Sequence, residues 1–254
     1  MKKNSFKINV YDAGDVASIS VACKLASKTL DYLESQVRVG VTTKRLDELC
    51  EKFILDHGGI PACKGYQGFP ASLCTSVNSV ACHGVPDDVP LQDGDIINLD
   101  VVVNLNGWHG DTSRTFPVGT VAQRHLDLIN IARKAMYVGI EAIKPGSRFN
   151  DIGIAVSRYI NSKKGFCLIK EFCGHGIGRQ MHEEPLVLHF PISKSTSLIE
   201  PGMCFTIEPI VSCGSSNTIQ MKDGWTMVTT DRSFASQFEH TIFIDEEYRP
   251  NILT

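Results

Sequence analysis

The alternation of apolar and polar positions divides the chain into two similar halves. Residues 13–37 and 122–143 each carry apolar side chains at helical spacing, and each is followed by a shorter amphipathic segment. A shift of 106 residues, the separation between Gly40 and Gly146, aligns five apolar positions of the shorter segments without a gap. These positions are Leu46, Leu49, Cys50, Phe53 and Ile54 in the first half and Ile152, Ala155, Val156, Tyr159 and Ile160 in the second. Any two amphipathic helices align somewhere, but the matching glycine favours an internal repeat.

Candidate caps and β-prone runs complete each half. Thr42 or Thr43 can cap the first shorter helix, and Ser147 can cap the second. No polar linker separates the halves, so we expect one α+β domain over residues 1–254, with a shared sheet and a site between the repeats. The repeats are approximately residues 13–120 and 121–245, and the β-prone runs of the second lie around 166–173, 203–212, 225–230 and 238–245.

Two aspartates lie in runs that predict a β-hairpin. Residues 96–103 are apolar and β-branched, residues 104–107 have turn chemistry, and residues 108–116 form the return strand. This hairpin carries Asp100 and Asp111. Carboxylates that face one another at about 5 Å repel by on the order of 3 kcal/mol, so the hairpin predicts a nearby cation.

The length of the turn decides how the two carboxylates meet. A four-residue loop would place Asp100 directly opposite Asp111. A turn at Asn106-Gly107 alone would place Asp111 opposite Val102, diagonal to Asp100 on the same face. A three-residue loop would put the aspartates on opposite faces unless a bulge restored the parity.

Three further residues are candidates for the same site. His175 lies between glycines, which let the backbone approach a ligand closely. Glu208 ends an apolar run, where a carboxylate is costly unless paired, and Pro209 interrupts the strand beside it. Glu239 lies in a β-prone run of its own.

The five residues form an oxygen-rich set with a single imidazole. Such a set suits divalent ions such as Mn²⁺, Fe²⁺, Co²⁺ or Zn²⁺, whose identity it leaves open. Four carboxylates carry a charge of −4, which two divalent ions balance, and this favours a dinuclear centre with a bridging hydroxide. The reaction class that follows is metal-assisted hydrolysis.

Two other histidines are candidates for catalysis. His83 follows an apolar segment, and His182 lies seven residues after His175. An isolated histidine is more often structural than catalytic, and we give that interpretation to the rest, namely His57, His109, His125, His189 and His240.

The composition excludes several function classes. The chain has 254 residues, 43% of them hydrophobic and 21% charged, and a net charge of −3, which predicts neither nucleic-acid nor anionic-membrane binding. Its nine cysteines include no Cys-x-x-Cys pair, which fits reduced, buried thiols. The sequence has neither an export signal nor a stretch of about 18 apolar residues, so we expect a cytoplasmic protein.

Several motifs resemble those of the type I methionine aminopeptidases. They are Ile97-Asn98-Leu99-Asp100, His109-Gly110-Asp111-Thr112-Ser113, Gly174-His175-Gly176-Ile177-Gly178-Arg179, Ile207-Glu208-Pro209 and Phe238-Glu239-His240-Thr241. The similarity runs from about Gly40 to Ile244. It implies the pita-bread fold, in which two halves related by a pseudo-twofold axis surround a curved antiparallel sheet, and hydrolysis of the N-terminal methionine from nascent peptides.

The resemblance also implies residue roles. Two divalent ions would be bound by Asp100, Asp111, His175, Glu208 and Glu239. Of these, Asp111 and Glu239 would bridge the two ions. Glu208 would also be the proton shuttle for the attacking water. His83 would face the scissile amide nitrogen, and His182 would stabilise the tetrahedral oxygen or the following peptide bond.

By the same resemblance, a pocket of soft sulfur and aromatic side chains would hold the methionine. Its residues would be Cys63, Tyr66, Phe69, Cys74, Met181 and Trp225. Bacterial relatives often have Tyr and Phe in place of Phe69 and Met181, which would change the pocket's shape and flexibility. The resemblance further implies a preference for a small second residue, nascent polypeptides as substrates and the ribosome as a candidate partner, and we expect a monomer.

Two rival functions are weighed against this one. Prolidase and aminopeptidase P share the fold but carry a separate N-terminal domain, whereas here the metal-binding domain begins almost at once. A noncatalytic pita-bread module that binds peptides or ribosomes tends to lose metal ligands, and all five are present here.

Overall fold

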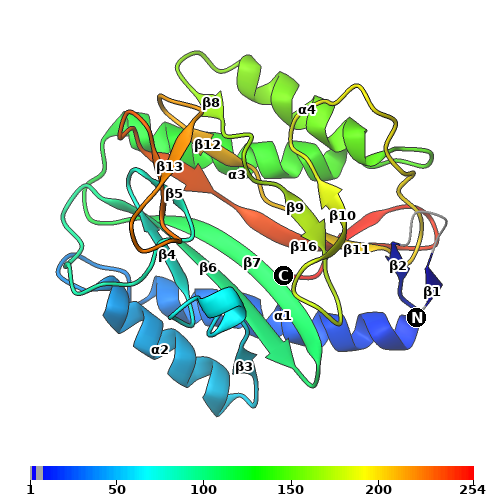
Figure 1. Cartoon of the computed structure of the whole chain (residues 1–254), viewed down its shortest axis with the longest axis horizontal. Coiled ribbons are helices and arrows are strands. Elements are labelled where there is room, and N and C mark those ends of the chain that lie inside the picture. Colours follow the sequence, from blue (N-terminus) through cyan, green and yellow to red (C-terminus); the bar gives the residue numbers. More distant parts are fainter. Residues whose placement is uncertain (1, 4–7) are drawn as a thin grey trace.

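Four helices confirm the helical segments expected from the sequence. A computed structural model describes residues 2–3 and 8–254 of the chain, and Figure 1 shows one pair of helices in the lower part of the view and another pair in the upper part. The helices are α1 (Ala13–Glu34), α2 (Thr43–Asp56), α3 (Gln123–Glu141) and α4 (Phe149–Asn161), with a short 3₁₀ turn at Tyr66–Gly68. In the described part of the chain, no helix combines the length and apolarity needed to cross a bilayer.

Within the described residues, the strands form one nine-stranded antiparallel sheet and three small ones. Those of the large sheet are β3 (Ile60–Pro61), β4 (Cys74–Val77), β6 (Ile96–Leu105), β7 (Trp108–Pro117), β9 (Gly174–Gly176), β10 (Glu183–Val187), β11 (Cys204–Ile207), β16 (Glu239–Ile244) and β17 (Pro250–Ile252). The small sheets contain β1 (Lys2–Lys3), β2 (Asn9–Val10), β5 (Val80–Cys82), β8 (Cys167–Leu168), β12 (Ile210–Ser212), β13 (Thr218–Gln220), β14 (Met227–Thr229) and β15 (Ala235–Gln237).

The large sheet repeats itself about the contact between β7 and β16. On one side of this contact the order is β7-β6-β4, and on the other it is β16-β11-β9. The contact is symmetrical as well: the Thr112 hydroxyl donates to the Glu239 carbonyl, and the Thr241 hydroxyl donates to the Asp111 carbonyl, both at 2.8 Å. The predicted pair of equivalent halves is therefore present in the sheet.

The helix pairs follow the same repeat. Gly40 and Gly146 both have left-handed backbone, with φ of 87° and 84°. The side chain of Thr42 caps α2 by accepting from the amide of Arg45, as predicted. The residue that the 106-residue shift places on Thr42 is Arg148, and it is the N-cap of α4.

The expectation that Ser147 caps α4 is wrong. Its hydroxyl turns back to the preceding turn, where it accepts from the Lys144 amide and donates to the Ala142 carbonyl. The Asp151 carboxylate accepts the Arg148 amide instead, at 2.7 Å, so an acid in the first turn takes over part of the capping.

The β6–β7 hairpin has the two-residue turn. Asn106 and Gly107 both have positive φ, 54° and 79°, a geometry whose twist matches that of the flanking strands. Asp111 therefore pairs with Val102, and Asp100 pairs with Ser113. Direct opposition of the two aspartates is wrong and the diagonal arrangement is confirmed, which lowers the repulsion to about 2 kcal/mol at about 7–8 Å.

The strands of the second half depart from expectation in one place. The run at 203–212 splits into β11 and β12 around Glu208 and Pro209, as the proline predicted. The run at 166–173 forms only the short β8, because Glu171, Phe172 and Cys173 leave the sheet to line a cavity.

The helices cover the sheet face opposite the acidic residues. At Gly110, one residue before Asp111, an added Cβ would lie 2.3 Å from the backbone nitrogen of Cys23 in α1. Alternation along β7 then points Asp111 to the other face. In the second half Gly139 of α3 approaches the Ile207 side chain in the same way.

We predict that Gly110→Ala lowers the free energy of unfolding by about 1–3 kcal/mol, because α1 backbone occupies the space that the methyl group needs. Urea unfolding of the purified variant measures this change. Gly14→Ala is the control, since this glycine lies in the exposed first turn of α1, with the exposed Asp12 carboxylate oxygen at 3.3 Å as its nearest neighbour. Alanine there leaves stability unchanged or raises it by up to about 1 kcal/mol. Equal stability of the two variants would contradict the packing argument.

Candidate active site

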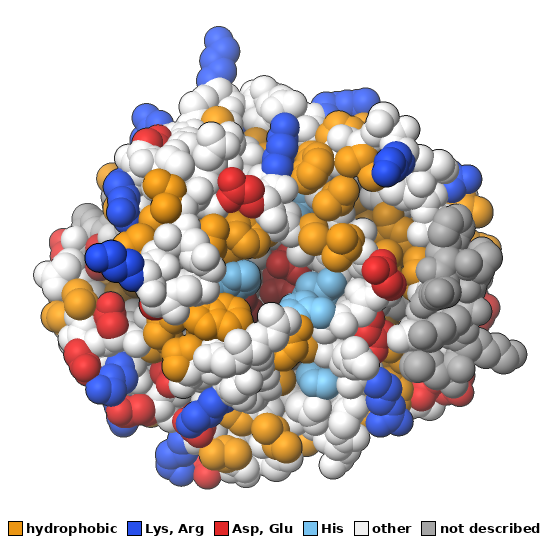
Figure 2. Space-filling view, viewed as in Figure 1, with side chains coloured by type: hydrophobic (Ala, Val, Ile, Leu, Met, Phe, Trp, Pro, Cys, Tyr) orange, Lys and Arg blue, Asp and Glu red, His pale blue; other side chains and the backbone are white. Residues whose placement is uncertain are grey.

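One cavity of about 890 Å³ contains every residue that the sequence singled out for chemistry or substrate binding. Figure 2 shows it as a hollow near the centre of the face, with acidic side chains in its depth and histidines at its rim. The cavity is lined by the expected metal ligands Asp100, Asp111, His175, Glu208 and Glu239, by His83 and His182, and by Cys63, Tyr66, Phe69, Cys74, Met181 and Trp225. Residues far apart in the sequence thus share one site.

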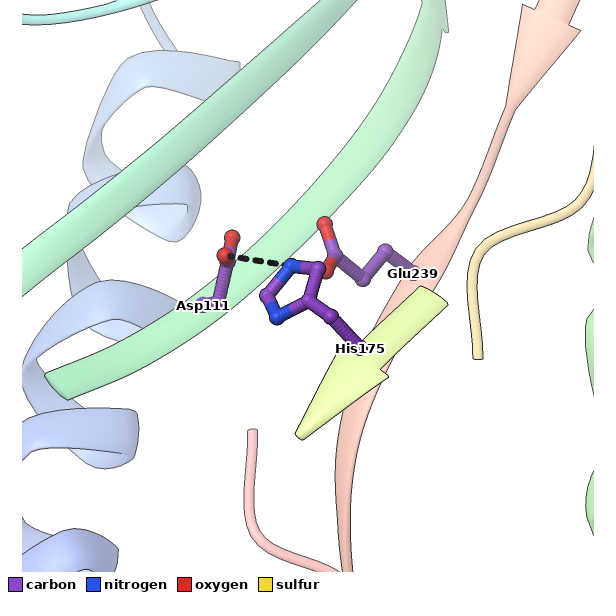
Figure 3. Close-up of side chains that lie close together, drawn as sticks. All are labelled: Asp111, His175 and Glu239. Atoms are coloured by element: carbon purple, nitrogen blue, oxygen red, sulfur yellow. Dashed lines mark ion pairs between the residues drawn. The ribbon is translucent and has the colours of Figure 1, made fainter. Parts of the chain in front are cut away.

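The four carboxylates, here called the acidic cluster (Asp100, Asp111, Glu208 and Glu239), come from four neighbouring segments. Asp111 of β7 and Glu239 of β16 stand on the two central strands. Asp100 lies on β6, and Glu208 follows directly after β11, so each half supplies one central and one outer carboxylate. Asp111, His175 and Glu239 offer ligand atoms that all lie within 4.8 Å of one another (Figure 3).

His175 directs an unprotonated nitrogen at the acidic cluster. Its Nδ1 lies 3.0 Å from the carbonyl oxygen of Gly176, so this nitrogen carries the proton and donates. Its Nε2 then bears a lone pair, 3.5 Å from the Glu208 Oε1 and 3.7 Å from the Asp111 Oδ2. Burial lowers the pKa of His175 to about 3, so the ring supplies no positive charge at neutral pH.

The acidic cluster is electrostatically unsatisfied without cations. Burial raises the pKa of Asp100 to about 7 and that of Glu208 to about 8, and burial with mutual repulsion raises the pKa values of Asp111 and Glu239 well above the usual range. In the described part of the chain, no Lys or Arg forms an ion pair with these groups.

Three buried carboxylate oxygens of the acidic cluster also have no hydrogen-bond partner. They are Asp100 Oδ1, Asp111 Oδ1 and Glu239 Oε1. Buried charges are normally paired or bound to metal. Carboxylate oxygens and one imidazole nitrogen are suitable ligands for first-row divalent ions, so the residues present fit such ions.

Glu208 is held by groups that the sequence analysis did not identify. The Thr206 hydroxyl donates to the Glu208 Oε1 at 2.6 Å, and the Gln237 Nε2 donates to its Oε2 at 3.3 Å. The Glu208 backbone amide donates to His189, which had been interpreted as structural. Thr206 and Gln237 each lie two positions before a cluster glutamate, so the alternation of a strand could have indicated them.

His83 and His182 lie above the acidic cluster. The His182 ring is 4.3 Å from that of His175, and its Nδ1 is 2.7 Å from the Tyr66 hydroxyl. His83 has a left-handed backbone, with φ of 54°, and packs edge-on against Phe172 at 5.5 Å. Burial and the neighbouring His182 lower the pKa of His83, so it is neutral at pH 7.

An apolar pocket adjoins the acidic cluster. Its buried residues are Cys63, Phe69, Ala71, Cys74, Val102 and Met181, with Ala62, Tyr66, Val85 and Trp225 packed against them. Phe69 and Trp225 meet edge to face at 5.2 Å. All nine cysteines of the chain are free thiols, and those in this pocket present a polarizable surface.

Comparison with known proteins agrees with this geometry. The Metallopeptidase family M24 matches residues 17–246. The methionine aminopeptidase of Rickettsia prowazekii is 44% identical over 241 residues, which cover 94% of this chain and 93% of that protein. The chain belongs to metallopeptidase family M24. The methionine aminopeptidase of Escherichia coli K12, another relative, is 42% identical over 94% of the chain and 91% of its own length.

Solved structures confirm the fold of this M24 chain. The crystal structure of methionine aminopeptidase from Rickettsia prowazekii superimposes with a TM-score of 0.94 at 43% identity, over 97% of this chain and 99% of that one. The Xaa-Pro dipeptidase from Bacillus anthracis superimposes with a TM-score of 0.76 at 21% identity, over 96% of this chain but 61% of its own, and shows the fold alone. The predicted pita-bread fold and the resemblance to methionine aminopeptidases are confirmed.

We predict that the metal-free M24 chain becomes less stable between pH 6.5 and about 8.5. The folded-state pKa values of Asp100 and Glu208, about 7 and about 8, exceed those of the unfolded chain. The folded state therefore binds more protons, and its stability is lost as the pH rises through these values. Histidines of the unfolded chain still bind some protons near pH 6.5, which opposes this loss, but they are neutral above about pH 7.5, where the carboxyls alone set the slope.

Thermal unfolding of chelated protein measures the slope against pH. Asp100→Asn should flatten the slope, whereas Asp127→Asn, an exposed carboxyl on α3, should leave it unchanged. Saturating Mn²⁺ should raise the melting temperature most at high pH, because the ions replace the protons. A metal-free slope of zero or of opposite sign would refute the assignment.

Proposed function

We propose that this M24 chain removes N-terminal methionine from polypeptides with a small second residue, using two divalent ions. The observation that carries the proposal is the contact, in one cavity, between the acidic cluster and a pocket of sulfur and aromatic side chains. The names of the relatives at 42% and 44% identity support the same activity. The free thiols fit a reducing compartment such as the cytoplasm, where nascent polypeptides are available.

In this proposal the acidic cluster and His175 would hold the two ions, and Asp111 and Glu239 would be the ligands shared between them. The symmetric positions of these two residues on the central strands support the bridging role. Divalent ions bound here would lower the pKa of a water molecule and polarise the scissile carbonyl. The methionine side chain would lie among Cys63, Tyr66, Phe69, Cys74, Met181 and Trp225.

The chain's own residues then orient the substrate and move the proton. Glu208 takes the proton of the attacking water and passes it to the leaving amine, and its two oxygens are aimed by Thr206 and Gln237. His83, neutral because it is buried, hydrogen-bonds the scissile amide. When the Tyr66 hydroxyl donates to the Nδ1 of His182, the Nε2 of this ring carries the proton and can donate to the tetrahedral oxygen.

Substrate comparison tests the activity. We expect chelated protein reloaded in turn with Mn²⁺, Fe²⁺, Co²⁺ or Zn²⁺ to release methionine from Met-Ala-Ser. Met-Leu-Ser should be cleaved at least about tenfold more slowly, because a branched second residue must fit beside His83 and His182. Preferential cleavage of an Xaa-Pro dipeptide would indicate a prolidase instead. A metal-loaded but inactive protein would favour the peptide-binding module.

Metal titration by calorimetry tests the ligand set separately. We expect Asp111→Asn to lose affinity by more than about 100-fold, because it removes a charge shared between two ions. Asp127→Asn is the matched control and should bind as the unmodified chain does. Unchanged stoichiometry and affinity in Asp111→Asn would exclude the bridging role, whatever the peptidase assay shows.

A further inference from the structure

The segment that precedes α1 reaches across to the wall of the cavity. There the Tyr11 hydroxyl donates to the Glu183 Oε2 at 2.6 Å, and the Asn9 Nδ2 donates to the same oxygen. The other oxygen of this carboxylate accepts the backbone amide of Gln180 at 3.0 Å. One carboxylate thus joins the start of the chain to the loop at residues 178–183, here called the wall loop. Asn9 and Glu183 themselves line the cavity.

Tyr11 is itself rigidly placed. It is 4% exposed, and its ring meets that of Trp108 edge to face at 5.6 Å. Its backbone amide donates to the Gly202 carbonyl at 2.8 Å. The ring lies against Gly178, where an added Cβ would be 2.0 Å from the Tyr11 hydroxyl oxygen, so the wall loop begins at a residue shaped to admit this side chain.

The wall loop has a second contact with the same platform. The guanidinium of Arg179 stacks 3.7 Å above the ring of Trp108. Because Arg179 is occupied in this way, Glu183 has no ion pair within the described residues, and neutral donors hold its charge. Glu183 pairs with Gly176 in the sheet, and the His109 amide donates to the Gly178 carbonyl at 2.8 Å, so the two ends of the loop are held by backbone. Hydrogen bonds to a charged acceptor are the stronger kind, so the bonds to the Glu183 carboxylate add a restraint between these ends.

The wall loop carries two residues that would touch the substrate. Met181 is buried in the apolar pocket, and His182 follows it, against the ring of His175. Neither is bonded to Tyr11 or Asn9, and both immediately precede Glu183. The Glu183 carboxylate reaches this loop through the Gln180 amide, directly before Met181, so loss of its fixed position would loosen the backbone that carries both residues.

We propose that Tyr11 and Asn9 are positioning residues for the substrate. Through Glu183 they fix the wall loop, and they thereby set how far Met181 and His182 lie from the methionyl peptide. The effect on the substrate rests on the proposed function, whereas the restraint of the wall loop by Tyr11 and Asn9 does not. It makes the segment before α1 part of the active site.

Tyr11→Phe tests the proposal, because it removes the hydroxyl and keeps the ring that packs on Gly178 and Trp108. We expect the KM for Met-Ala-Ser to rise about fivefold or more, as one hydrogen bond to a charged group is lost and Met181 shifts, and kcat to fall because His182, which would donate to the tetrahedral oxygen, shifts with it. Metal affinity by calorimetry should not change, since the wall loop carries none of the five ligands. The control is Tyr32→Phe, whose ring stacks on Phe53 away from the cavity.

Hydrogen exchange supplies a readout that needs no activity. In Tyr11→Phe the amide of Gln180 should exchange about tenfold faster or more, while amides of β6 and β7 keep their rates. Asn9→Ala should give a smaller change in the same direction, and it also serves if Tyr11→Phe folds poorly.

The outcomes separate the two proposals. A metal-loaded wild type that does not release methionine contradicts the proposed function, and exchange then decides whether the wall loop is held. An active enzyme whose KM and exchange are unchanged in both variants overturns the positioning role. If the Gln180 amide exchanges faster but the KM is unchanged, the wall loop has no effect on substrate binding. If the KM rises but exchange is unchanged, Tyr11 and Asn9 do not act on the substrate through the wall loop.

Discussion

Four carboxyl groups and one imidazole lone pair converge in the depth of one cavity, where most of their surface is shielded from water. Their pKa values shift in the directions that deprive the site of charge: the carboxyls bind protons more tightly and the imidazole binds its proton more weakly. A positive charge among the carboxylates would keep them ionised at neutral pH. No lysine or arginine of the described chain forms an ion pair with them. Affinity for divalent ions is thus a consequence of how the chain folds.

The repeated architecture explains how so costly an arrangement is held in place. The strands that carry Asp111 and Glu239 are neighbours, and each is flanked by its own half of the sheet. Reciprocal threonine bonds lock the two strands beside these residues. The helix pairs cover the opposite face and bury two large apolar clusters there, which stabilise the fold independently of the acidic cluster.

Under the proposed function, specificity for methionine depends on parts of the chain outside this symmetric frame. The apolar pocket is formed by the segment around Cys63 to Cys74, by Trp225 and by the wall loop. The wall loop is tied to a tyrosine and an asparagine near the start of the chain. Loops are usually more mobile than the sheet beneath them, and here a part-buried hydrogen-bond network links one of them to the segment before α1.

Periodicity and residue chemistry alone predicted the four helices and the equivalence of the halves, because both depend on spacing within short segments. They also predicted the acidic cluster, because a charge in an apolar run is costly unless it is paired or bound to metal. The choice between a direct and a diagonal pairing of Asp100 with Asp111 required the turn geometry, since one residue of register moves a side chain to the other face. Ser147 failed as a cap because the amides it would accept are bonded to a distant segment: that of Phe149 donates to the Ser197 carbonyl and that of Asn150 to the Thr196 hydroxyl. Thr206, Gln237 and the link from Tyr11 to Glu183 emerged only from the folded chain. Local pattern cannot reveal a hydrogen bond between residues 172 positions apart, because its existence depends on how distant segments are brought together by packing.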